Sequence, residues 1–256
     1  MLTDYVKQGV MAGIIAGLIF GLLMALVANP LVAFADEFGH SGDHAVDDHH
    51  DTTAGGHHDS AVSMSVTNGV SILSGVFWGV LLGGVVFGVV YYLLEPAIPG
   101  AGSTKSYLLA AAGFLTVSGA PWLVLPPQPP GVEQTLPTAT RLLLYGGMMA
   151  AGALASLLAG VIYNRLHVAH RRVTAAAVAV LPICLLAIPA MLAPRNAVET
   201  TLPSELAVGV TGLIIFGQAG LWLLLANIHA QLQRRADMRD SAQPTATQLD
   251  GASTPE

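Results

Sequence analysis

GVMAGIIAGLIFGLLMALVA, residues 9–28, carries no charged side chain. An α-helix needs about 20 mostly apolar residues to span the hydrocarbon core of a bilayer, so this stretch predicts a transmembrane helix. Glycine recurs at every fourth position, as Gly9, Gly13, Gly17 and Gly21. This spacing lets two helices approach closely in lipid, and it favours tight packing over a glycine-lined permeation path.

Five further apolar runs follow along the chain. With the first run they predict an all-α, polytopic transmembrane helix bundle of about six spans. Pro121 interrupts the third run near its end, and Pro182 and Pro189 should kink the fifth, because proline removes a backbone donor. The expected spans are residues 9–28, 69–94, 107–125, 142–163, 173–192 and 206–228.

Composition supports a membrane protein and excludes several other classes. The 256 residues are 53% hydrophobic and 10% charged, whereas soluble domains are about 25% charged. A net charge of −6 with only two lysines argues against a nucleic-acid partner. The single cysteine, Cys184, excludes an intrachain disulfide and a cysteine-based metal cage. No nucleophile and base constellation stands out, so we expect a protein that is not an enzyme.

The distribution of lysine and arginine predicts the orientation of the spans. Positively charged short loops tend to stay in the cytoplasm, and eight of the ten basic residues fall on one side of the expected spans. Only Arg141 and Arg195 fall on the other side. We therefore expect a multi-pass protein of the cell membrane with both termini in the cytoplasm. The eight are Lys7, Lys105, Arg165, Arg171, Arg172, Arg234, Arg235 and Arg239.

The chain divides into four expected parts. Residues 1–35 hold the first transmembrane segment or, alternatively, a secretory signal cleaved after Ala33-Phe34-Ala35, which would leave five spans. Residues 36–68 form a disordered external loop rich in histidine and aspartate, and residues 69–230 hold helices two to six. Residues 231–256 are small and polar, and they predict a disordered cytoplasmic tail.

The stretch HSGDHAVDDHHDTTAGGHHD, residues 40–59, holds six of the nine histidines. Imidazole and carboxylate bind Co²⁺, Ni²⁺ and Zn²⁺ well. The spacing matches no rigid zinc site, and the glycines favour flexibility, so we expect a loop that collects metal with several stoichiometries. A solvated acidic loop is the alternative. The candidate ligands are His40, Asp43, His44, Asp47, Asp48, His49, His50, Asp51, His57, His58 and Asp59.

Polar residues near membrane spans are functional candidates. Asn29 and Glu95 each precede a proline at an expected helix end, on opposite sides of the membrane, where they either mark a transport route or cap helices. His229 is expected at the end of the sixth helix, as an exit-side ligand or as a residue satisfied by carbonyls or water. Gln128 lies within a proline-rich stretch and Glu133 shortly after it, and this stretch is either a rigid connector or an entrance for cations.

Three segments resemble the CbtA family, whose members are predicted cobalt transporter subunits. They are ALVANPLVAFADE (25–37), LEPAIPG (94–100) and TKSYLLAAAGFLTVSGAPWLVLPPQPPGVEQTLP (104–137). The resemblance implies a role in cobalt supply for cobalamin synthesis and a small partner, CbtB, with one spanning helix and a histidine-rich end. It carries over no ligand residue, and family members are often described with five spans.

The expected function is a membrane permease component for uptake of a divalent transition metal, with residues 40–59 collecting it outside. Co²⁺ is the expected substrate, with Ni²⁺ or Zn²⁺ as alternatives, and no tightly bound cofactor is expected. The partners would be the lipid bilayer, a CbtB-like subunit and further copies of the chain. The alternative function is a membrane-anchored metal sensor or assembly scaffold that binds metal without conducting it.

Overall fold

The first helix is longer than the apolar run that predicted it. In the computed structural model, α1 (Leu2–Leu23) continues through the π-helical η1 (Met24–Ala28) and on to Phe34. Asn29 and Pro30 therefore lie within the helix instead of ending it. The structure describes residues 2–34, 63–129, 132–168, 172–199 and 202–242.

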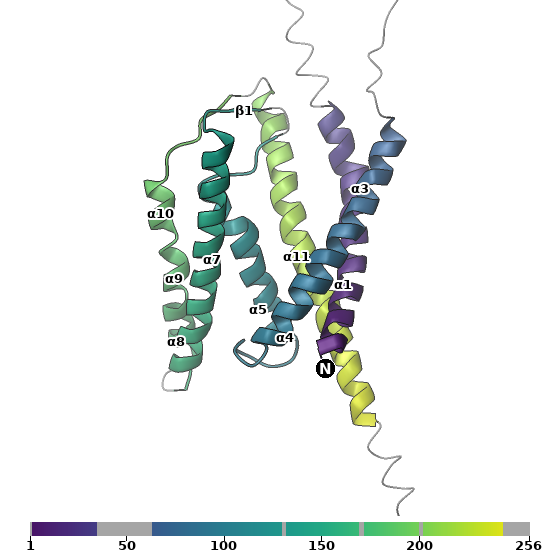
Figure 1. Ribbon diagram of the computed structural model, residues 1–256, viewed down its shortest axis with the longest axis vertical. Helices are drawn as coiled ribbons and strands as arrows, with labels where there is room; N and C mark the ends of the chain where they lie inside the picture. The colour runs from purple at the N-terminus through teal and green to yellow at the C-terminus, as the bar shows by residue number, and fades with distance from the viewer. Residues whose placement is uncertain (1, 35–62, 130–131, 169–171, 200–201, 243–256) are drawn as a thin grey trace, which may run out of the picture.

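The next two helical stretches contain π-helical segments as well. The first runs from one end of the bundle to the other, and the second returns toward the first end (Figure 1). The first consists of α3 (Met64–Gly79), η2 (Val80–Phe87) and α4 (Gly88–Leu94). The second consists of α5 (Ser103–Phe114), η3 (Leu115–Gly119) and α6 (Ala120–Trp122).

The remaining chain adds two long helical elements, a broken one and a minimal sheet. The broken one lies where Pro182 and Pro189 predicted kinks. The helices are α7 (Thr138–Leu166), α8 (Arg172–Ala179), α9 (Leu181–Cys184), α10 (Ala187–Leu192) and α11 (Ser204–Ala242). The two strands, β1 (Glu133–Gln134) and β2 (Val198–Glu199), pair antiparallel.

The architecture confirms an all-α polytopic bundle. Five helices among the described residues are long and apolar enough to cross a membrane, compared with the six spans expected. The expected span 107–125 is not among them, because Ser103–Trp122 contains Lys105 and several small polar residues and ends at the proline-rich stretch. The five are Leu2–Phe34, Met64–Leu94, Thr138–Leu166, Arg172–Leu192 and Ser204–Arg239.

The helices run roughly along one axis, which gives the bundle two distinct ends (Figure 1). We call the end with the start of α1 and the C-terminal part of α11 the terminal end. The opposite end, where α1 stops at Phe34 and α3 starts after Ser63, is the loop end, and the small sheet lies there as well. The chain between α4 and α5, the end of α7 and the start of α8 lie at the terminal end.

Glycine backbones bring α1 into direct contact with α3 and η2. A Cβ on Gly9 would lie 2.5 Å from the carbonyl oxygen of Gly83, and a Cβ on Gly13 would overlap the carbonyl of Gly79. On the other side, a Cβ on Gly75 would lie 2.6 Å from the Gly17 oxygen. Two helices whose backbones touch leave no channel between them, so the glycine stripe serves packing here.

Two π-helical segments end two residues before a proline and have a common physical cause. Proline lacks an N–H and its ring clashes with the carbonyl four residues earlier, which a wider π turn relieves. The segment η1 is followed by Pro30, and η3 is followed by Pro121. The Val117 carbonyl, which Pro121 leaves without its usual donor, accepts a hydrogen bond of 2.6 Å from the Tyr145 hydroxyl of α7. A neighbouring helix thus satisfies the freed carbonyl.

Two expected boundaries shift in the structure. Helix α3 begins at Met64, so residues 64–68 are helical and are not part of the loop. Helix α11 continues to Ala242, so residues 231–242 are helical and not part of a disordered tail. The tail residues 243–256 lie outside the described part of the chain. His229 consequently sits well inside α11, because the polar residues after it extend the helix beyond the apolar run.

Candidate functional site

The metal ligands predicted from the sequence lie outside the described residues, since all eleven fall between residues 35 and 62. The helices that flank them are described, and both meet the histidine-rich segment at the loop end. Among the residues that the structure does describe, no three His, Cys, Asp or Glu side chains form a group that could hold a metal ion.

A polar cluster joins α1 and α3 near the loop end. The Asn29 side-chain amide donates to the Asn68 side-chain oxygen and to the Ser71 hydroxyl, each at 2.9 Å. The three side chains are partly buried. Asn29 was singled out from the sequence as a helix-ending residue, whereas its partners were not. The cluster ties together the two helices from which the histidine-rich segment leaves and to which it returns.

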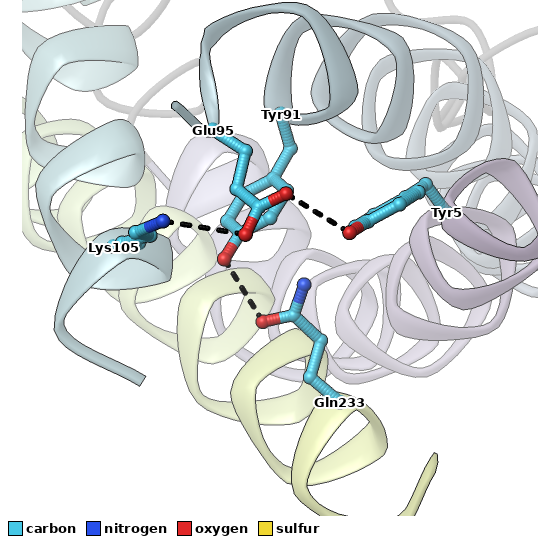
Figure 2. A network of polar contacts seen from close by, with 5 residues as sticks. All are labelled: Tyr5, Tyr91, Glu95, Lys105 and Gln233. Atoms are coloured by element: carbon cyan, nitrogen blue, oxygen red, sulfur yellow. Dashed lines mark hydrogen bonds and ion pairs between the residues drawn. The ribbon is translucent and has the colours of Figure 1, made fainter. Parts of the chain in front are cut away.

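A second polar cluster lies at the terminal end and is centred on Glu95 (Figure 2). The Tyr5 hydroxyl donates to one carboxylate oxygen at 3.0 Å, and the Lys105 ammonium lies 3.2 Å from the other. Tyr5 belongs to α1, Glu95 follows the last residue of α4, and Lys105 belongs to α5. The carboxylate therefore joins α4 to α5, the next helix in the chain, and to α1, which is distant in the sequence.

The position of Glu95 is electrostatically unfavourable on its own helix. It is the C-cap residue of α4, where the partial negative charge of the helix dipole repels a carboxylate. The cation on Lys105 and the hydroxyl of Tyr5 offset this repulsion. The side chain of Glu95 stays 37% exposed, so a carboxylate faces the terminal end of the bundle.

Tyr91 extends the Glu95 cluster into the core. Its ring is 2% exposed and stacks on Tyr5 with 5.8 Å between ring centroids. Its hydroxyl donates at 3.0 Å to the side-chain oxygen of Gln233 on α11 (Figure 2). Tyr91 and Glu95 are four residues apart, and so they share a face across the end of α4.

His229 lies deeper, one turn before Gln233 on α11, and is fully buried. Its Nδ1 pairs at 3.0 Å with the hydroxyl of Ser106, which is buried as well. Its ring contacts Tyr91 at 4.7 Å and Phe87 at 5.1 Å between centroids. The expectation that His229 ends a helix is wrong, because α11 continues past it and packs it against α4 and α5.

The proposed entrance at Gln128 has an unfavourable charge. Gln128 lines a hollow of about 480 Å³ at the loop end together with Tyr145 and Arg141. The Arg141 guanidinium donates a hydrogen bond of 3.1 Å to the Thr138 hydroxyl, and Thr138 lines this hollow as well. A fixed cation repels an arriving metal ion. The arrangement therefore favours the rigid connector over an entrance.

A second hollow, of about 560 Å³, lies between α5 and the helices α7 and α8. The residues that line it are mostly apolar, and many of them are small. Its polar lining residues include Thr104, Ser156 and Asn164. The Asn164 amide donates at 2.5 Å to the Ala97 carbonyl in the loop after α4. This region offers far fewer polar groups than the clusters around Glu95 and His229.

A family model described as probable cobalt transporter subunit (CbtA) matches residues 2–234. The match covers four candidate spans and most of the fifth, both polar clusters and the histidine-rich segment. No curated protein and no solved structure matches the chain. The family description supports a role in transport and names the protein a subunit, which implies at least one partner. With helices that can cross a membrane several times and a family match over most of its length, the chain belongs to the CbtA family.

Proposed function

We propose that the protein is a cell-membrane permease component for uptake of a divalent transition metal, with Co²⁺ as its substrate. The observation that carries the proposal is the family match over residues 2–234. Five helices able to cross a membrane within the described part of the chain, with polar clusters at both ends of the bundle, support it.

We propose that the terminal end faces the cytoplasm. The starts of α1, α5 and α8, the end of α7 and the C-terminal part of α11 bring Lys7, Lys105, Arg165, Arg172 and three further arginines to this end. Arg141 and Arg195 lie toward the other end. Basic residues flanking short loops favour the cytoplasmic side, so the loop end would face outward.

In the proposed function, the segment 40–59 collects metal outside the cell. Its six imidazoles and five carboxylates suit divalent cobalt, nickel and zinc. A run of such ligands raises the metal concentration at the loop end without forming part of the conducting path. Asn29, Asn68 and Ser71 would be among the first polar side chains that a cation meets on the bundle.

The membrane potential can drive this uptake without nucleotide hydrolysis. An elementary charge gains about 2.3 kcal/mol in 100 mV, so a divalent cation gains about 4.6 kcal/mol. That free energy corresponds to about a 2,000-fold accumulation. The family description as a subunit implies a partner protein. We propose that this partner is a small single-span protein with a histidine-rich end, resembling CbtB. The chain itself could also form a homo-oligomer.

Accumulation of radioactive Co²⁺ by cells tests this function against the sensor or scaffold alternative. Cells lacking their own high-affinity cobalt uptake would express the chain alone or with its single-span partner. The proposal predicts cobalt inside the cytoplasm that rises with time and falls when the potential is collapsed. A scaffold would bind cobalt at the surface only, so that a brief wash with an impermeant chelator removes all of it.

A further inference from the structure

His229 holds a buried ring nitrogen that has no hydrogen-bond partner in the described part of the chain. The side chain is 0% exposed, and its Nε2 makes no hydrogen bond to any of the described residues. A buried polar atom left unsatisfied costs about 1–3 kcal/mol. An unsatisfied polar atom in a native core requires an explanation, and a bound ion is one such explanation.

The other ring nitrogen of His229 is held in the way typical of metal-bound histidines. A ligating histidine almost always uses its second nitrogen to donate a hydrogen bond, which fixes the tautomer and the ring orientation. Here Nδ1 lies 3.0 Å from the Ser106 hydroxyl. When Nδ1 carries the proton and donates to Ser106, Nε2 keeps a free lone pair. The aromatic rings of Tyr91 and Phe87 pack against the imidazole and limit its rotation.

Oxygen atoms continue from His229 toward the terminal end. One turn along α11, the Gln233 side-chain oxygen meets the Tyr91 hydroxyl. One turn along from Tyr91, the Glu95 carboxylate meets Tyr5 and Lys105 and is partly exposed. Imidazole nitrogen followed by neutral oxygen and then carboxylate is a ligand series that divalent cobalt accepts. Lys105 already neutralises Glu95, so an arriving cation would compete with its ammonium.

The packing of the helices makes the side of α4 that carries Tyr91 and Glu95 its polar face. Glycine backbones close the contact between α1 and the α3–η2 stretch, so a cation cannot pass there. The side chains of Glu95, Tyr91 and His229 lie instead where α1, α4, α5 and α11 meet.

We propose that His229 binds the transported divalent metal through Nε2 at an interior site, and that the metal leaves past Tyr91 and Gln233 to Glu95. The site rests on the proposed transport function. Ser106 is a positioning residue that orients the imidazole. Because only one imidazole is involved and the other ligands are oxygens or water, binding is weak, as conduction requires.

Direct metal binding tests the site independently of transport. The full-length chain, purified without a histidine tag, would carry glutamine at the eight other histidines, namely His40, His44, His49, His50, His57, His58, His167 and His170. X-ray absorption of added Co²⁺ should show one imidazole in the coordination shell. Co²⁺, but not Mg²⁺, should raise the melting temperature, and H229N in the same background should abolish both signals. A shell of oxygens alone, or an unchanged signal in H229N, would overturn the site.

The choice of variants separates a ligand from a structural histidine. The asparagine amide reaches the position of Nδ1 and not that of Nε2, so H229N keeps a partner for Ser106 and deletes the proposed ligand. S106A should raise the half-saturating Co²⁺ concentration about tenfold through loss of orientation. H167N is the matched control, because His167 is exposed and bonds only the Tyr163 carbonyl among the described residues.

Measurements of Co²⁺ uptake then distinguish a failure of the His229 site from a failure of the proposed transport function. With only His229 changed, H229N should lower the saturating rate of Co²⁺ uptake about tenfold, the size expected for loss of a metal interaction, while H167N should match the wild type. Equal rates in H229N and wild type would overturn the site and leave the transport function standing. If the wild type moves no cobalt, the transport function fails, and the absorption experiment still decides whether His229 binds metal.

Discussion

The Tyr145 hydroxyl donates a 2.6 Å hydrogen bond to the Val117 carbonyl, the acceptor that Pro121 leaves without a backbone donor. Tyr145→Phe should therefore destabilise the protein by about 1 kcal/mol, since the carbonyl loses its donor within the bundle. Thermal unfolding in detergent measures the effect. Tyr107→Phe is the control, because its hydroxyl bonds the exposed side chain of Asn227. Equal melting temperatures for Tyr145→Phe and wild type would show that the carbonyl needs no side-chain donor.

Gly79→Ala should separate α1 from α3. The added methyl would meet the Gly13 carbonyl, and since that atom belongs to a helix backbone, a whole helix must shift. Overpacking of this kind costs about 1–3 kcal/mol. Gly69→Ala in the same helix meets nothing within 4 Å, and it should be neutral or stabilising because alanine favours a helix. Comparable melting temperatures for both variants would contradict the close backbone contact.

The apolar runs predicted most of the fold because spanning a bilayer constrains length and composition strongly. The prolines of the fifth run also predicted the breaks between α8, α9 and α10. Helix ends were harder to predict, since they depend on polar residues that extend a helix beyond the apolar core. Met64 and Ala242 illustrate this at the start of α3 and the end of α11.

The clusters at the two ends were predicted only in part. Glu95 and Asn29 stood out as polar residues beside prolines, and His229 was considered as an exit-side ligand. Their partners Tyr5, Asn68 and Ser106 were missed, because these come from other helices that meet them only through tertiary packing. Glycine spacing did indicate that α1 packs closely, but it did not identify α3 as its partner.

Glu95 and Lys105 provide a test of the terminal-end cluster. Lys105→Met should destabilise the protein by about 1 kcal/mol, a modest value because the carboxylate is partly exposed. Adding Glu95→Gln should recover part of that loss, since no unpaired charge then remains beside Tyr5 and at the end of α4. Thermal unfolding of the single and double variants measures both steps. A double variant less stable than Lys105→Met would contradict the pairing.

Labelling of single cysteines tests the orientation. The background is Cys184→Ser, since Cys184 is exposed and would react itself. An impermeant maleimide applied to intact cells should label Ser63→Cys at the loop end. It should leave Val168→Cys, at a position 81% exposed at the terminal end, unlabelled until the cells are opened. The opposite labelling pattern would place residues 40–59 in the cytoplasm and remove their role as collector.

Initial rates of Co²⁺ uptake into vesicles test the central claim most directly. The vesicles contain the chain, alone and with its single-span partner, under an inside-negative potential. We predict saturable Co²⁺ influx above that of protein-free vesicles. With glutamine at His40, His44, His49, His50, His57 and His58, influx should fall at scarce cobalt and recover at abundant cobalt, because a collector raises local concentration only. Absence of Co²⁺ influx in both wild-type preparations would contradict the claim that the chain conducts metal.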